Sequence, residues 1–294
     1  MSKVEISSDS LPGLYQSADQ ASLDAQEIYF KCLRWYLILL VCAAFISYAR
    51  PNDIVGALSS ASLFLITLGI LIFIRIRKPD DTWYNGRAVA ESVKTRAWRW
   101  MMRAEPYEIN ESIEIVSKQF IGDLKAILDQ NKSLSHSLQS TRAVEDPISQ
   151  SMRMVRDFPL VDRLALYVNQ RVQNQVEWYW TKSKFNKRKA HQWFWVSVIL
   201  HSTAIAMLLY RINAPALSLP VEVIATAAGA TLTWLQARKH NELNSAYALA
   251  AHEIILIKGE SMAVNTEEQL SEYVVNSESA FSREHTQWVA RKID

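Results

Sequence analysis

The sequence predicts an all-α membrane protein: two duplicated transmembrane helical hairpins, four transmembrane helices in all, carry long cytoplasmic helical extensions. Runs without Asp, Glu, Lys or Arg occur at 35–49, 54–74, 190–210 and 223–237. A run as long as 190–210 spans about 30 Å as a helix, which matches the hydrocarbon core of a bilayer. The runs come in pairs with short connectors, and the small numbers of Gly (7) and Pro (8) favour long helices.

The two pairs repeat at one spacing along the chain. An offset of 160 residues carries Lys31 onto His191 and Ile74 onto Trp234, so both ends of the first pair fall on ends of the second. The same offset brings 88–90 onto 248–250, and both triplets are apolar, with alanine at each end. A fixed period of this kind is typical of an internal repeat. We therefore expect two copies of one unit, a membrane hairpin followed by a cytoplasmic helix.

The amino-acid composition by itself excludes few classes of protein. The chain is 49% hydrophobic and 21% charged, and its net charge of +2 does not favour a nucleic-acid partner. Its two cysteines, Cys32 and Cys42, lie in or beside the first apolar run, where small apolar packing residues are expected rather than a disulfide framework.

The first unit is expected to cover 1–130, with membrane spans at about 33–50 and 54–75. Residues 14–50 contain neither Gly nor Pro, which predicts one helix that begins in the cytosol and enters the bilayer near Trp35. Arg34 is expected to snorkel to the interface. A buried helix of a soluble protein is the alternative for this segment.

Two more helices are predicted in this unit, at 87–103 and 108–128, followed by a linker at 131–158. The apolar positions of 87–103 share one side, at Val89, Val93, Ala97 and Trp100. Either this side packs on a neighbouring helix, or the basic residues and Trp98 lie on an anionic membrane surface.

The second unit is expected to cover 159–294, with spans at about 190–210 and 221–237. Residues 160–213 lack Gly and Pro, which predicts a continuous helix whose first half projects as a stalk. Candidate residues for stalk or oligomer packing are Val168, Val172, Val176, Trp180, Tyr247 and Ile254. The helix after the fourth span is expected to pair with this stalk; in the alternative, each apolar stripe packs only on its own unit. A last helix is predicted at 267–289.

The positions of Lys and Arg predict the orientation. Basic residues accumulate after 54–74, before 190–210 and after 223–237, whereas the connectors carry one each, Arg50 and Arg211. The positive-inside rule therefore places both termini and the middle region in the cytoplasm, and the protein in the membrane as a multi-pass chain.

The fourth apolar run is built from small and hydroxyl side chains. Ala225, Gly229 and Thr233 lie four apart, which favours close helix packing. The functional alternative is a polar path lined by several copies of the chain. Its candidate residues are Thr226, Thr233, Gln236, Glu222, Ser59, Ser62 and His201. Because one hairpin cannot enclose a channel, this hypothesis requires a homo-oligomer; an isolated, solvated Glu222 is the simpler alternative.

The chain carries no motif for catalysis. It lacks a P-loop, a dinucleotide-binding glycine motif and a nucleophile elbow, and its six histidines stand at no zinc-binding spacing. We therefore expect no enzyme activity, no metal and no cofactor.

Several stretches resemble one family. YQSADQASLDAQ at 15–26, WYNGRAVAESVKT at 83–95 and MRAEPY at 102–107 are similar to one SLATT domain. RVQNQVEWY at 171–179, TAAGAT at 226–231 and SREHTQWVAR at 282–291 are similar to another SLATT subtype. SLATT abbreviates SMODS and SLOG-associating two-transmembrane effector.

The resemblance implies an inner-membrane effector of a bacterial conflict or defence system. Such an effector is expected to form a pore or perturb the membrane when a cytosolic nucleotide signal or a separate sensor protein triggers it. Its partners would be membrane lipid, further copies of itself and that sensor. Two alternatives remain open: a non-conducting membrane scaffold for a cytosolic signalling partner, and a small-molecule or ion transporter.

Overall fold

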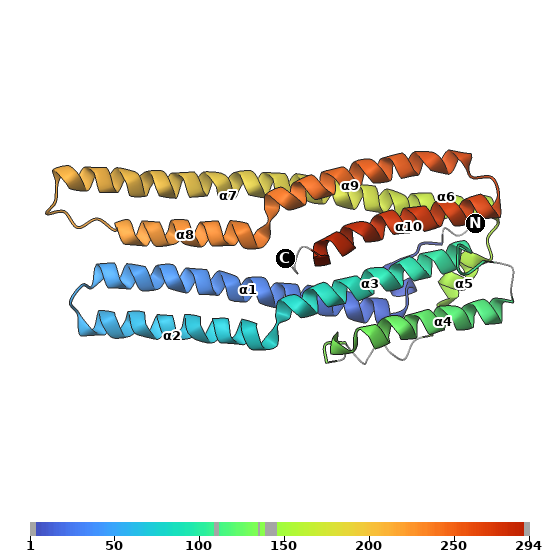
Figure 1. Cartoon of the computed structure of the whole chain (residues 1–294), viewed down its shortest axis with the longest axis horizontal. Helices are drawn as coiled ribbons and strands as arrows, with labels where there is room; N and C mark the ends of the chain where they lie inside the picture. The colour runs from blue at the N-terminus through green and yellow to red at the C-terminus, as the bar shows by residue number, and fades with distance from the viewer. Residues whose placement is uncertain (1–3, 109–111, 135, 139–145, 291–294) are drawn as a thin grey trace. The chain divides into compact units, whose positions relative to one another are not determined.

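The computed structural model describes residues 4–108, 112–134, 136–138 and 146–290. The described residues are 85% helical and contain no strand, which confirms the all-helical prediction (Figure 1). The elements are η1 (Ser8–Ser10), α1 (Gly13–Ala49), α2 (Ile54–Arg77), α3 (Pro79–Met102), α4 (Ile113–Gln130), η2 (Lys132–Leu134), α5 (Gln150–Arg156), α6 (Leu160–Tyr167), the π-helical η4 (Val168–Val172), α7 (Gln173–Asn213), α8 (Val221–Arg238), α9 (His240–Glu260), η5 (Ser261–Ala263) and α10 (Glu267–Ala290).

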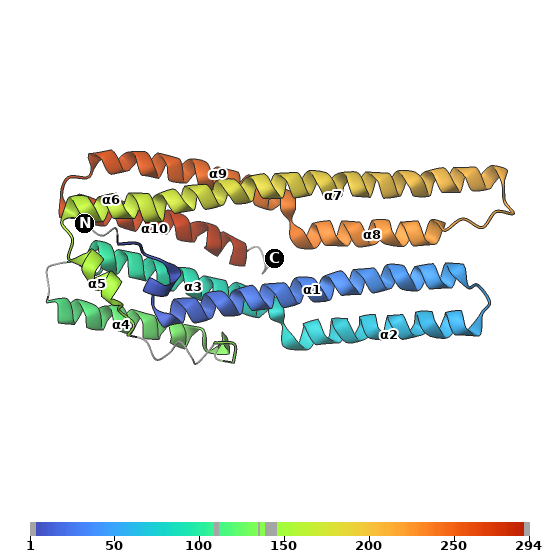
Figure 2. The same cartoon turned by 180° about the vertical axis from the view of Figure 1, so that it is seen from behind.

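The chain divides into two compact units, each assembled from segments distant in sequence. The first, here called the core unit, takes Met1–Gln26, Asp80–Thr181 and Ala246–Asp294. The second, the apolar unit, takes Glu27–Pro79 and Lys182–Ser245. Helices α1 and α7 run through both (Figure 2).

The hydrophobic core lies within the core unit, and α3 supplies its centre. The predicted face of this helix, with Val89, Val93, Ala97 and Trp100, is buried against neighbouring helices. Of the two alternatives, the structure thus confirms that this face packs on neighbouring helices and does not lie on a membrane surface. Helix α4 contributes Val116, Phe120 and Leu124, which are spaced four apart, and its Ser112 side chain caps the N-terminus by accepting a hydrogen bond from Ile115 N.

The range predicted as a linker, 131–158, contains two helical elements, η2 and α5. Ser149 caps α5 by accepting a hydrogen bond from Met152 N at 3.2 Å, and Met152 and Val155 are buried in the core. A seven-residue helix with two buried apolar positions has too little periodicity to stand out in a polar, Ser-rich sequence.

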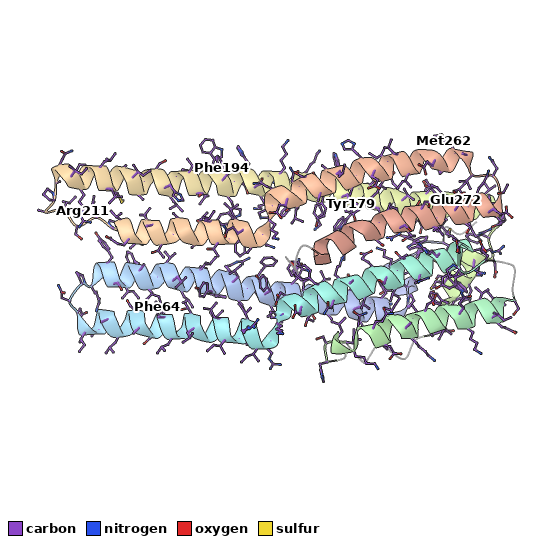
Figure 3. All side chains as sticks on the ribbon, in the orientation of Figure 1. Phe64, Tyr179, Phe194, Arg211, Met262 and Glu272 are labelled. Atoms are coloured by element: carbon purple, nitrogen blue, oxygen red, sulfur yellow. The ribbon has the colours of Figure 1, made fainter. Side chains whose placement is uncertain are left out.

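In the apolar unit, the later part of α1 and α2 form an antiparallel pair (Figures 1 and 2). The connecting turn places Asn52 at a positive φ of 66°, and Asp53 caps α2 by accepting a hydrogen bond from Val55 N. Ser60 makes polar contacts within the pair: its hydroxyl accepts a hydrogen bond from the Ser47 hydroxyl at 3.1 Å and donates one to Ala43 O at 3.2 Å. The outer face carries large exposed apolar side chains such as Phe64 (Figure 3).

Helices α7 and α8 form the other antiparallel pair of the apolar unit (Figures 1 and 2). α8 buries Val221, Val223, Ala228, Thr231 and Trp234, while α7 exposes apolar residues that include Phe194 (Figure 3).

Three helical stretches of the described chain are long and apolar enough to cross a membrane: Gly13–Ala49, Ile54–Met102 and Leu160–Asn213. Helix α8, the predicted span at 221–237, is not among them, because Ala, Gly and Thr are weakly hydrophobic and Glu222 and Arg238 lie near its ends. The structure thus supports a membrane protein with three candidate spans, and the fourth span and the duplicated hairpins stay predictions.

The apolar helices α2 and α8 end in the same way. Lys78 and Lys239 adopt left-handed conformations, with φ of 44° and 48°, and their N–H groups donate to Ile74 O and Leu235 O. The next helix begins at the following residue in both cases, at Pro79 and at His240. Pro79 suits the first helical position because its missing N–H has no partner there to lose.

Gly86 allows α3 to approach α1 within the core unit. A Cβ atom at this position would lie 3.0 Å from Ala18 O and 3.1 Å from the Ser22 Cβ. We expect Gly86→Val to lower the free energy of unfolding by about 1–3 kcal/mol, because the side chain overpacks this contact. The measurement is chemical unfolding of the detergent-purified protein, followed by tryptophan fluorescence.

The matched control is Gly122→Val in α4, where an added Cβ has no neighbour within 4 Å. Because valine has a higher helix propensity than glycine, this variant should be as stable as the wild type or slightly more so. Equal losses at the two positions would contradict the proposed close approach at Gly86.

Candidate functional site

Four of the predicted pore-lining residues share one face of α8. Glu222, Thr226, Thr233 and Gln236 recur at spacings of 4, 7 and 3 residues, and Gly229 lies between them on the same side. Glu222, Thr233 and Gln236 are exposed and Thr226 is half-buried, whereas the opposite face of α8 packs within the apolar unit. The chain thus leaves a polar strip uncovered on a helix that lies among apolar ones.

The threonines of this strip bond to their own helix. Thr226 Oγ1 donates to Glu222 O at 2.7 Å, and Thr233 Oγ1 donates to Gly229 O at 3.0 Å. Each hydroxyl therefore keeps its acceptor lone pairs for another partner. At the connector end of α8, the Glu222 carboxylate lies 3.9 Å from the Arg211 guanidinium, and both side chains are largely exposed. An exposed pair of this kind adds little stability, so Glu222 stays available to solvent.

The other predicted pore residues lie on other helices. Ser59 and Ser62 are on α2, where the Ser62 hydroxyl donates to Leu58 O at 2.8 Å. His201 is exposed on α7, with Nδ1 2.7 Å from Ser197 O. The hydrogen bonds of Ser62 and His201 therefore stay within their own helices, and these contacts do not bring them to the α8 strip.

The predicted stalk residues divide into buried and exposed ones. Val172 and Ile254 are buried in the core, and Val168, Val176 and Tyr247 pack partly against it. Trp180 is 55% exposed. Trp178 and Tyr179 make aromatic contacts between α7 and α9, with ring centroids 5.4 and 5.7 Å from that of Tyr247.

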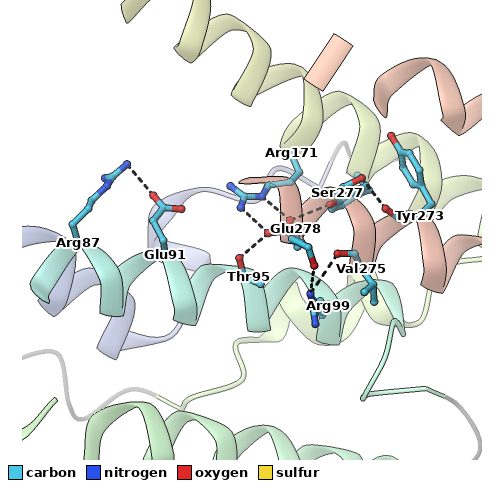
Figure 4. A network of polar contacts seen from close by, with 11 residues as sticks. Arg87, Glu91, Thr95, Arg99, Arg171, Tyr273, Val275, Ser277 and Glu278 are labelled. Carbon is cyan, nitrogen blue, oxygen red and sulfur yellow. Dashed lines mark hydrogen bonds and ion pairs between the residues drawn. The ribbon is translucent and has the colours of Figure 1, made fainter. Parts of the chain in front are cut away.

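A buried ion pair joins η4 to α10 in the core unit (Figure 4). The side chains of Arg171 and Glu278 are 1% and 0% exposed, and two N–H···O contacts of 2.8 and 2.7 Å connect them. Glu278 also accepts hydrogen bonds from Tyr167 Oη at 3.0 Å and from Thr95 Oγ1 at 2.9 Å. One carboxylate thus connects α3, the α6–η4 helix and α10.

Burial and the Arg171–Glu278 ion pair together shift the pKa values of the residues in this cluster. Burial acts to lower the pKa of Arg171, but the Glu278 carboxylate outweighs it, and the net pKa is raised. Burial raises the pKa of Tyr167 well above its usual value, with Glu278 adding to the shift. Burial lowers the pKa of nearby Lys94, and the Arg171 charge acts in the same direction. Arg171 therefore stays charged and Tyr167 stays a hydrogen-bond donor across the physiological pH range.

Two further arginines satisfy the carboxyl end of α3. The last carbonyls of a helix have no partner within the helix. Arg156 donates to Trp100 O and, at 2.9 Å, to Tyr107 O; Arg163 donates to Met102 O at 2.7 Å and forms an ion pair with Glu267 of α10. Burial lowers the pKa of Arg156 to about 10, with the charges of Arg103 and Arg163 contributing, so this residue also remains charged near neutral pH.

The network of buried arginines around Glu278 and the end of α3 was not predicted from the sequence. Arg163, Tyr167 and Arg171 are spaced four apart, the same spacing as the valine stripe beside them, but charged residues at helical spacing usually face solvent. The segment Val168–Val172 is π-helical, and its wider turn keeps residues four apart on one face. A periodic set of arginines interrupted by a tyrosine was the available signal.

His240 is the buried histidine of the apolar unit. Its Nδ1 lies 2.7 Å from Asn186 Oδ1, and the Asn186 amide nitrogen donates to Lys182 O, so the amide oxygen faces the ring. Burial lowers the pKa of His240, and the charges of Arg238 and Lys189 lower it further. The fold therefore favours the neutral imidazole. In the described part of the chain, no group of three or more His, Cys, Asp or Glu residues is arranged to hold a metal ion.

Two family profiles match consecutive parts of the chain. SMODS and SLOG-associating 2TM effector domain 3 matches residues 12–164, and SMODS and SLOG-associating 2TM effector domain 1 matches residues 167–288. The chain belongs to the SLATT family. It carries two SLATT subtypes in tandem, as the sequence resemblance predicted. Searches of curated proteins and of solved structures gave no match.

SLATT domains are two-transmembrane effector domains associated with conflict and defence systems. The core unit combines both domains of this SLATT protein: α3 and α4 come from the first matched range, and α9 and α10 from the second. The Arg171–Glu278 pair lies in the second range, and Thr95 connects it to the first.

The burial of the Arg171–Glu278 pair predicts how substitutions there change the stability of the protein. Glu278→Gln leaves the Arg171 charge buried without its counter-ion, and we expect a loss of about 3–5 kcal/mol in the free energy of unfolding. Replacing both residues, Arg171→Met with Glu278→Leu, should recover much of this loss, because no uncompensated charge remains. Chemical unfolding of the purified variants measures both effects.

The matched control for these variants is Arg153→Met, which removes an exposed ion pair with Asp146 in the same unit. It should cost less than about 1 kcal/mol. An equally small effect of Glu278→Gln would contradict the burial of the Arg171–Glu278 pair.

The lowered pKa of His240 predicts a pH dependence. Above the unfolded-state pKa of about 6.5, both states hold a neutral imidazole and stability is complete. As the pH falls through this value, the unfolded state binds a proton more readily than the folded state, so stability declines. The melting temperature of the wild type should fall more between pH 7.5 and 5.5 than that of His240→Gln.

His252→Gln, an exposed substitution on α9, is the control for this measurement and should behave as the wild type. Identical pH profiles for wild type and His240→Gln would show that the fold does not discriminate against the protonated ring.

Proposed function

We propose that this SLATT protein is an oligomeric effector of a bacterial defence system, in the inner membrane, which opens a polar path when a cytosolic signal or sensor triggers it. The observation that carries this proposal is the uncovered polar face of α8, with Glu222, Thr226, Thr233 and Gln236. The proposal also rests on the family's description as transmembrane effector domains and on the three helical stretches that could cross a membrane.

The cost of exposing each surface to lipid supports oligomerisation. In the apolar stretches of the three candidate spans, only 11%, 11% and 0% of the residues are buried within the protein. Lipid can therefore cover these stretches directly. Lipid covers a carboxylate or a carboxamide only at a cost of several kcal/mol. The α8 strip is therefore more stable in contact with protein or water than in contact with lipid. Several copies that turn this strip toward a common axis provide both.

Such an arrangement has a defined chemistry. Glu222 from each copy forms a ring of carboxylates at the connector end, which favours cations, and the threonine hydroxyls and Gln236 follow along the path. A helix rich in Ala, Gly and Thr also permits close approach between copies. The low hydropathy of α8, which keeps it from the candidate spans, is what a pore-lining helix requires.

The proposed orientation places the core unit in the cytoplasm. Arg75, Arg77 and Lys78 follow the apolar run of α2, and Arg238 and Lys239 follow that of α8, whereas each connector carries a single basic residue, Arg50 or Arg211. The signal would then act on the core unit. Because α6, η4 and α7 are one continuous helical stretch, a shift near Arg171 has a covalent route to the apolar unit.

A non-conducting scaffold is the second candidate function, and the outer face of α9 favours it. Leu256 is 73% exposed and Met262 in the adjoining η5 is 90% exposed, with Leu249 one heptad before Leu256. Exposed apolar residues on a unit outside the membrane are typical of a partner surface. In this case, changes on α9 would abolish function and changes on the α8 strip would not.

The decisive experiment is ion and dye flux from liposomes that contain the purified oligomer, together with membrane depolarisation on overexpression. Thr226→Leu combined with Thr233→Leu should reduce flux roughly tenfold or more, because apolar side chains dewet the path. Chemical cross-linking should show an unchanged oligomer. Ser202→Leu, the same kind of substitution at an exposed position of α7, is the control and should leave flux intact.

Sealed liposomes and polarised cells with the wild-type protein under the triggering condition would contradict pore formation. Full flux in the Thr226/Thr233 double variant would show that α8 does not line the path.

A further inference from the structure

Two guanidinium groups converge on one tryptophan in the apolar unit. The Cζ atom of Arg238, the last residue of α8, lies 5.0 Å from the ring centroid of Trp234 and 3.9 Å from that of Phe30. The Cζ atom of Arg34, on α1, lies 5.7 Å from the same Trp234 centroid. Helices α1 and α8 lie side by side (Figures 1 and 2). Tertiary structure thus joins two cations about 200 positions apart in sequence.

Neither guanidinium has a carboxylate partner among the described residues. At the connector ends of the apolar unit, by contrast, Arg50 pairs with Asp53 and Arg211 with Glu222. The Nε atom of Arg238 is buried and makes no hydrogen bond within the described chain. Burial lowers the pKa of Arg238, and the charge of Arg34 lowers it further. An anion would offset the repulsion between these two cations and would satisfy the unused buried donor.

The position of the cluster indicates the source of that anion. Arg34 directly precedes the apolar run that begins at Trp35, and Arg238 directly follows that of α8. Trp193 of α7 lies 6.1 Å from Trp234 in centroid distance, and Trp35 and Trp195 are exposed nearby in sequence. Tryptophans at the end of an apolar segment are typical of the membrane–water interface, which is the depth of the lipid phosphates.

We propose that Arg34 and Arg238 bind the phosphate of an anionic phospholipid, with Trp193 and Trp234 as the aromatic floor of the site. Guanidinium groups bind phosphate in a bidentate manner, and the unused Arg238 Nε is one of the donors. Basic sites between membrane helices on the cytoplasmic side are the usual places for such headgroups. The proposal requires insertion of the apolar unit in a membrane and does not require a pore.

A bound lipid would also explain why two cations are tolerated here. The phosphate replaces the missing carboxylate, and the cation–π contacts hold both guanidinia in place before the lipid arrives. A soluble phosphate has the same chemistry, but it must leave bulk water, whereas a lipid already presents its phosphate at this depth. The two sources are therefore separable by experiment.

The test is native mass spectrometry of the full chain in detergent, titrated with phosphatidylglycerol, with phosphatidylcholine or with inorganic phosphate. The wild type should retain phosphatidylglycerol in preference to phosphatidylcholine, and inorganic phosphate should neither bind detectably nor displace the lipid. Arg34→Gln and Arg238→Gln should each weaken phosphatidylglycerol retention roughly fivefold or more. Arg238→Lys should lose less, because the positive charge remains.

Arg188→Gln is the matched control, since Arg188 is an exposed arginine just before the apolar run of α7 at 190–210 but is not part of the cluster. It should retain phosphatidylglycerol as the wild type does. Equal losses for Arg188→Gln and Arg34→Gln would overturn the local site in favour of diffuse charge. Binding of inorganic phosphate with the same variant sensitivity would overturn the lipid as its source.

Arg34 is exposed, so Arg34→Gln tests the site even if Arg238→Gln fails to fold. The readout is lipid retention in detergent and involves no flux. A chain that retains the lipid but does not conduct would contradict the proposed pore alone, and a conducting chain without lipid selectivity would contradict this site alone.

Discussion

The lack of internal cover for its apolar helices is the constraint on which the rest of this structure depends. A single chain cannot bury helices such as α2 on all sides, so most of their large side chains face outward. In a membrane this costs nothing, because lipid takes the place of a protein core. The hydrophobic core is accordingly confined to the core unit, and polar residues left on an apolar helix become informative. The α8 strip and the Arg34–Arg238 cluster are such residues.

Within the core unit, charges organise the packing as much as apolar contacts do. Arg156 and Arg163 satisfy the carboxyl end of α3, and Glu278 connects three helices around the buried Arg171. Such contacts are directional, so they determine which helix neighbours which and at what register, while apolar contacts alone permit sliding. Because these contacts join helices of both SLATT domains, the tandem chain behaves as one assembly at this point.

The sequence predicted local structure well where the physics is local. The lack of Gly and Pro in 14–50 and 160–213 indicated continuous helices, and the structure has α1 and the α6–η4–α7 stretch there. The apolar face of α3 was predicted from its spacing and is buried. The short helix α5 was not predicted, because three apolar residues in seven do not make a helical period. The ring contacts of Trp178 and Tyr179 with Tyr247 were not predicted, because they depend on how α9 packs on α7.

By itself, the sequence determined the all-helical class, the long apolar segments and the family, because composition, periodicity and motifs are properties of the chain. Only the tertiary structure decided which charges are buried together and which polar residues stay uncovered. Arg171 with Glu278, and Arg34 with Arg238, are separated by long stretches of chain, and a solvated arginine has the same sequence signature as a buried one. Their chemistry depends on which side chains the fold places beside them, and no local pattern encodes that.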